Sequence, residues 1–136
     1  VAAYDFYNKI GYMAHIMLPG AAPYYYSNLK TRYAADAIAQ LTEYMIINRT
    51  DCKTIEFCVI GGANVLKKND DTICQNNINS VISSLTDYYK LKIAAIRVGG
   101  ELRRSASLDT GSGAIYYTEG DSGKILLWLP PGKNIL

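Results

Sequence analysis

The residues best suited to chemistry are one histidine and three cysteines. Histidine is the residue type that moves protons most readily near neutral pH, and His15 is the only one in the 136 residues. It stands between Ala14 and Ile16 in an apolar run, where a histidine is more often a hydrogen-bonded core residue than a catalyst. From residue type alone, a general acid or base and a structural histidine both stay open.

The three cysteines are irregularly spaced, which argues against a disulfide framework and against a zinc site. Cys58 falls in an apolar run, where we expect a buried, unreactive thiol. Cys74 comes just before a helical pattern, and a helix N-terminus would favour its thiolate. Cys52 lies in a polar stretch without an activating neighbour. No cysteine stands out as a nucleophile, and we expect neither a metal site nor a cofactor.

Bulk composition indicates one ordinary folded domain over residues 1–136. Hydrophobic residues make up 49% and charged residues 19% of the chain. The net charge of +2 gives no reason to expect nucleic-acid binding or attraction to an anionic membrane. No apolar run approaches the roughly 20 residues that span a bilayer, and no signal-peptide pattern opens the chain. We therefore expect a cytoplasmic protein that is not inserted in a membrane.

Sequence patterns typical of strands and helices alternate along the chain, and the predicted elements position these residues. β-Branched and aromatic residues over 1–7 and 10–18 predict a hairpin whose second strand carries His15. Apolar residues at helical spacing predict one helix over 32–48 and a second over 78–89.

Two predicted strands end in a pair of glycines. The apolar run 55–60 and the run 91–98 each predict a strand, and a glycine pair follows each of them. Such pairs most often serve a tight turn or close packing. Residues 19–30 predict a surface loop. The tail predicts an antiparallel meander with strands over 105–108, 114–118 and 125–129. Two helices and about seven strands indicate an α+β domain.

Five segments, in chain order, resemble the CheD family. The segment 11–19 (GYMAHIMLP) resembles the family phrase in which Gly, Met, Ala and His precede an apolar run and Leu-Pro. The other four segments are RYAADAI (32–38), IGGANV (60–65), ICQNN (73–77) and VGGELRR (98–104). Segment 32–38 orders its small and acidic residues differently from the family. In the last two segments, Cys74, Asn76 and Arg103 replace a family Gly, Arg and Gly.

The resemblance implies a three-layer α/β/β sandwich with mixed sheets, in which the two main helices cover one face. It also implies a glutamine deamidase that acts on the cytoplasmic helices of chemoreceptors through a cysteine–histidine thioester mechanism. His15 would be the catalytic imidazole. A phosphatase of the CheC type is a further candidate partner. The residues that the resemblance places around the substrate are Gly61, Gly62, Asn77, Gly99, Gly100 and Arg104.

In the family the nucleophile is the cysteine of a Gly-Ser-Cys phrase, and a threonine just upstream orients the histidine. By the family spacing we expect this cysteine a few residues before Val1, in an N-terminal segment that the sequence does not include. Two other functions stay open: a non-catalytic adaptor that binds a chemotaxis phosphatase or a receptor, and a cysteine hydrolase of the same fold that acts on another amide.

Overall fold

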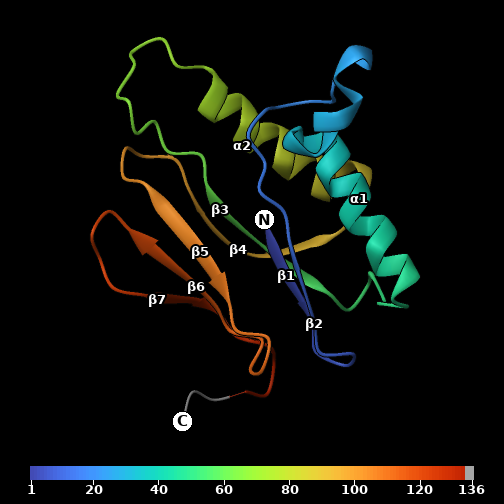
Figure 1. Ribbon diagram of the computed structural model, residues 1–136. Helices are drawn as coiled ribbons and strands as arrows, with labels where there is room; N and C mark the ends of the chain where they lie inside the picture. The colour runs from blue at the N-terminus through green and yellow to red at the C-terminus, as the bar shows by residue number, and fades with distance from the viewer. Residues whose placement is uncertain (134–136) are drawn as a thin grey trace.

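The computed structural model describes residues 1–133, apart from the side chains of Tyr26 and Ser27. It contains two main helices and seven strands, as the sequence predicts (Figure 1). In chain order the elements are β1 (Ala2–Asp5), β2 (Ile10–Met13), the 3-10 helix η1 (Tyr24–Arg32), α1 (Ala34–Ile47), β3 (Glu56–Gly61), α2 (Ile73–Ser83), the π-helical turn η2 (Ser84–Tyr88), β4 (Lys92–Val98), β5 (Arg104–Leu108), β6 (Ile115–Glu119) and β7 (Ile125–Trp128).

The strands form two sheets. The first has the order β2-β1-β3-β4; β1 pairs antiparallel with β2 and β3, whereas β3 and β4 are parallel. A parallel pair needs a crossover connection, and α2 with η2 supplies it. The second sheet is the predicted meander β5-β6-β7, which is antiparallel throughout. Only the first sheet is therefore mixed.

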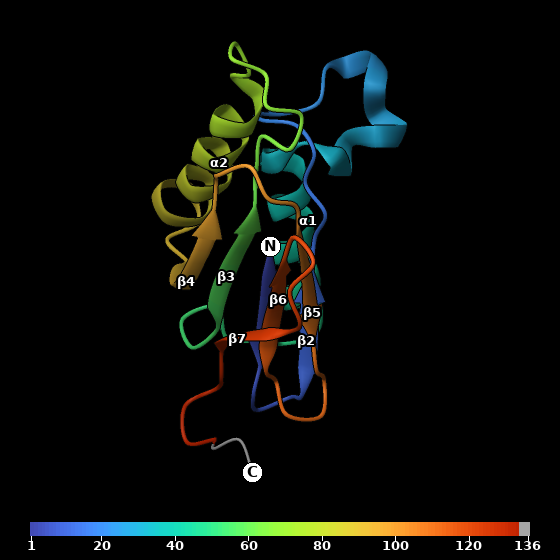
Figure 2. The ribbon, with the colours of Figure 1, turned by 90° about the vertical axis from the view of Figure 1, so that its left-hand side faces the viewer.

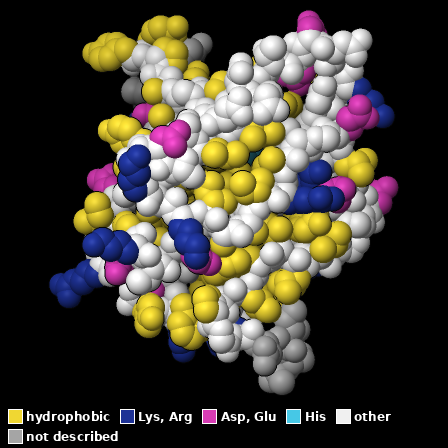
Figure 3. Space-filling model, turned by 180° about the vertical axis from the view of Figure 1, so that it is seen from behind, with side chains coloured by type: hydrophobic (Ala, Val, Ile, Leu, Met, Phe, Trp, Pro, Cys, Tyr) yellow, Lys and Arg dark blue, Asp and Glu magenta, His cyan; other side chains and the backbone are white. Residues whose placement is uncertain are grey.

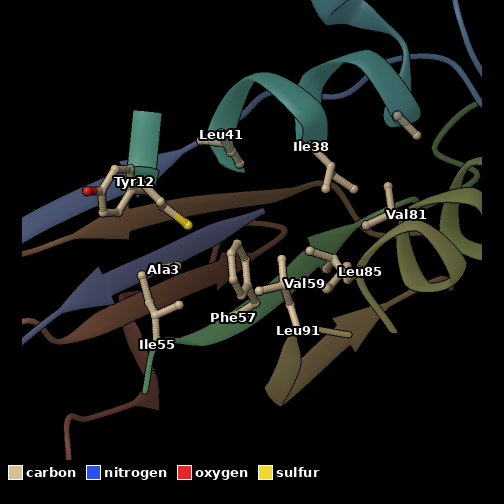
Figure 4. Packing of buried hydrophobic residues seen from close by; sticks show 12 residues of the cluster. Ala3, Tyr12, Ile38, Leu41, Ile55, Phe57, Val59, Val81, Leu85 and Leu91 are labelled. Carbon is tan, nitrogen blue, oxygen red and sulfur yellow. The ribbon is translucent and has the colours of Figure 1, made fainter. Parts of the chain in front are cut away.

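Alternation along the first sheet produces three layers. Ala3, Phe57 and Val59 belong to a core cluster shared with both helices (Figure 4). Their neighbours Ala2 and Cys58 point to the other face, where they pack in a second cluster with residues of the meander. Figure 2, viewed from the side of the second sheet, shows that sheet in front of the first. The predicted α/β/β sandwich is confirmed.

The predicted hairpin forms, but its second strand is shorter than expected. β2 ends at Met13, so His15 lies in the irregular segment that follows and not within the strand. Ala14 still exchanges two backbone hydrogen bonds with Val1, each 3.0 Å long. Beyond it the segment turns toward α1, because the backbone N–H groups of Met17 and Leu18 both donate to the carbonyl of Arg32.

Two further boundaries differ from the prediction. The expected surface loop over 19–30 contains most of η1, which the polar and aromatic composition of that stretch does not reveal. The second helix begins at Ile73, five residues earlier than predicted, because Asp71 Oδ1 accepts a 2.9 Å hydrogen bond from the Ile73 N–H at its start. Its first turn is polar and largely exposed, so apolar spacing could not reveal it.

Candidate active site

A cavity of about 680 Å³ opens where β3 and β4 end. The segment that carries His15, the middle of α2 over 77–81 and the start of β5 complete its wall. Figure 3 shows hydrophobic side chains gathered on this face of the molecule. The wall is thus mainly apolar and carries a few polar groups, a combination typical of ligand sites. Its polar lining residues are His15, Asn77, Arg103, Arg104 and Ser105.

His15 is exposed and reaches the cavity from a segment that is fixed at both ends. Upstream, Ala14 pairs with Val1; downstream, Met17 and Leu18 bond to Arg32. Within the described part of the chain the imidazole has no hydrogen-bond partner, so this histidine is not a satisfied core residue. An accessible imidazole on a well-anchored backbone is available for proton transfer.

The first glycine pair shapes the cavity wall at the end of β3. Both glycines line the cavity, and both have positive φ, 120° at Gly61 and 63° at Gly62. A Cβ on Gly62 would lie only 2.5 Å from Cγ1 of Ile78 on α2. Glycine is needed here because it allows the turn and lets α2 approach the sheet closely.

The second glycine pair lies just outside the wall and supports it. The Gly99 N–H donates to the Gly61 carbonyl at 3.0 Å, and the Asn64 N–H donates to the Gly100 carbonyl at 2.8 Å. These two bonds tie the loop after β4 to the loop after β3. Of the two predicted glycine pairs, only Gly61 and Gly62 face the cavity directly.

Arg104 lines the cavity, but its guanidinium is already engaged. Its side chain is only 6% exposed; Nε donates to Glu119 at 2.8 Å, and Nη1 donates to the Gly99 carbonyl. The guanidinium of Arg104, with that of Arg97, holds the pKa of the Glu119 carboxyl below its ordinary value. Arg104 therefore fixes the loop after β4 onto β6 rather than offering a free cation. Sequence reasoning had no signal for Glu119, because this partner of Arg104 lies on another strand, β6.

Asn77 lies opposite the histidine segment on α2. Its Nδ2 donates to the Ile16 carbonyl at 3.4 Å, and its Oδ1 is buried without a partner among the described residues. The structure thus brings His15, Gly61, Gly62, Asn77 and Arg104 around one cavity. Sequence reasoning missed Val1 and the apolar lining residues, whose only signal was their place at strand ends. It also missed Arg103 and Ser105.

No cysteine lies in the wall of this cavity. Burial raises the pKa of the Cys58 thiol to about 12, as expected of a core thiol. Burial also raises the pKa of Cys52. The expected effect of the helix N-terminus on Cys74 is reversed: its thiol donates to the Asp71 carboxylate at 3.1 Å, and that bond raises its pKa. All three positions disfavour the thiolate.

Two classes of feature are not found in the part of the chain that the structure describes. Residues 1–133 contain no group of three or more His, Cys, Asp or Glu side chains placed to hold a metal ion. Over the same residues, no helix has both the length and the apolarity to cross a bilayer.

The fold and the cavity together define a class of protein: a three-layer α/β/β domain with an accessible histidine in a cavity lined by apolar and a few polar residues. A sequence profile described as "CheD chemotactic sensory transduction" matches residues 17–119, which begin two residues after His15. The chain belongs to the CheD family. The site residues from Gly61 to Arg104 fall within the matched region.

Individual relatives agree with the profile. The chain is 38% identical over 128 residues to a Chlorobium luteolum protein named "Probable chemoreceptor glutamine deamidase CheD". It is 26% identical over 118 residues to the Thermotoga maritima "Chemoreceptor glutamine deamidase CheD". These alignments cover 94% and 87% of this chain. The chain spans 63% of the length of the Chlorobium protein and 73% of the Thermotoga protein.

Proposed function

We propose that this protein deamidates selected glutamine side chains of chemoreceptor cytoplasmic helices, with His15 as its catalytic imidazole. The observation that carries the proposal is an exposed imidazole, without a partner among residues 1–133, in a cavity of a CheD-family domain whose lining is apolar with a few polar groups. An apolar wall suits the aliphatic stem of a glutamine, and the few polar groups suit its carboxamide. The names of the relatives supply the reaction and the receptor as substrate.

The strand register supports a nucleophile from chain that precedes Val1. Ala2 pairs with Met13, and Val1 and Ala14 exchange both backbone hydrogen bonds. If the antiparallel pairing continued by one residue, the residue before Val1 would stand opposite His15. That position is a non-hydrogen-bonded pair, in which the Cα atoms are about 4.5 Å apart and the side chains share a face. A cysteine one or three residues before Val1 would therefore project toward the imidazole.

The chemistry follows from a thiol and an imidazole in reach of each other. His15 takes the thiol proton, and the thiolate adds to the amide carbon of the glutamine. The tetrahedral adduct expels ammonia as the C–N bond breaks and the imidazolium returns its proton, which leaves a thioester. His15 then takes a proton from water as the hydroxide adds to the thioester carbon. The C–S bond breaks, the thiol is re-formed, and the side chain leaves as a glutamate.

The test uses the full-length protein and a receptor cytoplasmic fragment. Mass spectrometry of the fragment should locate glutamines converted to glutamate, with equimolar ammonia release. Replacement of the upstream cysteine by serine should stop both. Two results would contradict the proposal. Binding of the receptor without any conversion would indicate the adaptor function, and conversion of small free amides alone would indicate a hydrolase with another substrate.

A further inference from the structure

One buried polar atom beside the cavity has no hydrogen-bond partner among the residues that the structure describes. Asn77 Oδ1 is buried, and no donor among the described residues reaches it. The orientation of this amide is well determined, because its other end faces the Ile16 carbonyl and only an NH2 group can donate there. Buried polar atoms are nearly always paired, so an unpaired one needs an explanation, and a ligand-binding role is one of the few available.

We infer that Asn77 Oδ1 accepts a hydrogen bond from the carboxamide NH2 of the substrate glutamine, which makes Asn77 a specificity-determining residue. The inference rests on the proposed function. Asn77 lines the same cavity as His15, and its amide contacts the carbonyl of Ile16, the residue after His15, so a carboxamide next to the imidazole lies close to Asn77. Because Oδ1 is buried, the contact requires the Asn77 carboxamide to rotate about its last torsion, which is broad.

Other donors on the wall do not fit this atom as well. Arg104 is committed to Glu119 and to the Gly99 carbonyl. Arg103, directly before β5, and Ser105, on β5, are exposed, and neither of them donates to Asn77 Oδ1. His15 is the remaining candidate, but its imidazole must stay free to exchange protons with the thiol and the leaving ammonia. A carboxamide brings two N–H donors of its own into the cavity.

An acceptor at this position would distinguish substrate from product. A glutamine side chain has N–H groups to donate, whereas the glutamate carboxylate has only acceptor oxygens. The lone pairs of Asn77 Oδ1 would therefore attract the amide and repel the new carboxylate, which favours release of the product. A methyl ester of glutamate has no N–H donor and is one heavy atom larger than glutamine, so a comparison of the two in proteins with and without the Asn77 acceptor isolates this contact.

The binding experiment uses the full-length protein with His15→Ala, which prevents turnover, and two helical receptor peptides. The peptides differ at one side chain, glutamine or the methyl ester of glutamate. With Asn77 present, the glutamine peptide should bind about tenfold more tightly than the ester. In Asn77→Leu the two should bind equally. Asn77→Asp keeps an acceptor oxygen and should keep the preference.

The matched control is Asn76→Leu, the same change at the exposed neighbour on α2, which should leave the preference as it was. Unfolding curves identify any variant that fails to fold. A preference that survives in a folded Asn77→Leu protein overturns the inference. So does a change in the ring-nitrogen NMR signals of His15 when Asn77→Leu is made in the protein that keeps this histidine, because the imidazole would then be the donor. If neither peptide binds even with Asn77 present, the proposed function itself fails.

Discussion

Two polar clusters lie at opposite ends of β1, and they differ in how completely their atoms are paired. At the C-terminal end of β1, far from the cavity, Asp5 is 6% exposed, and both of its carboxylate oxygens accept hydrogen bonds. Oδ1 takes the N–H groups of Tyr7 and Asn8, while Oδ2 takes the Asn8 amide at 2.7 Å and the Thr50 hydroxyl at 2.6 Å. Thr50 also shares a 2.7 Å bond with the Tyr12 hydroxyl. Every polar side-chain atom of Asp5, Thr50 and Tyr12 is used.

At the N-terminal end of β1, Val1 borders the cavity, and some polar side-chain atoms around it form no hydrogen bond to the described residues. His15 is exposed without a partner in the described chain, and Asn77 leaves one buried acceptor unpaired. Complete pairing stabilises a fold, whereas unpaired groups beside a cavity are available to a ligand. The difference teaches that the Asp5 end contributes to stability, whereas the His15 end has polar groups that are available to a ligand.

The largest stability effect is expected at the cavity end, from Gly62→Ala. The new Cβ requires a positive φ and overlaps Ile78, so the free energy of unfolding should fall by about 3 to 4 kcal/mol. Gly20→Ala is the matched control: it has a similar φ but open space around it, and should cost about 1 to 2 kcal/mol. Denaturant unfolding measures both. Equal losses would show that α2 does not depend on close approach at Gly62.

A smaller loss is expected at the far end, from Thr50→Val. The change removes the hydroxyl that joins Asp5 to Tyr12 and leaves the buried phenol of Tyr12 without its partner. The free energy of unfolding should therefore fall by about 2 kcal/mol. The exposed Thr54→Val should change the stability by less than about 0.5 kcal/mol. A neutral Thr50→Val would mean that the network contributes little, and the contrast between the two ends would lose its basis.

The smallest effect is the acid dependence that Asp5 contributes. Burial raises the pKa of this carboxyl, but hydrogen bonds from Thr50, Asn8 and Tyr7 outweigh it and leave the pKa below its ordinary value. Its stabilisation is therefore complete above the unfolded pKa of about 4 and is lost as the pH falls through the folded value. Asp5→Asn should make the fall in unfolding free energy below about pH 4 shallower. An unchanged slope would contradict this assignment.

Apolar spacing predicted most of the fold, because the buried positions of α1, α2 and β3 follow a local sequence pattern. The same pattern could not reveal the end of β2 at Met13, since that end depends on pairing with another strand. At the site, motifs brought His15, Gly62 and Asn77 to attention. Two features of the site required coordinates. The ion pair between Arg104 and Glu119 joins two different strands. The unpaired acceptor of Asn77 depends on which donors lie near it in space.

The most direct test of this contrast compares His15→Ala with Thr50→Val in the full-length protein. Turnover of receptor glutamines and the free energy of unfolding are measured on the same samples. We expect His15→Ala to lower turnover by about 10²- to 10⁴-fold with stability nearly unchanged. Thr50→Val should lose stability and, where folded, keep its turnover. Retained turnover in His15→Ala would contradict the assignment of this cavity as the active site.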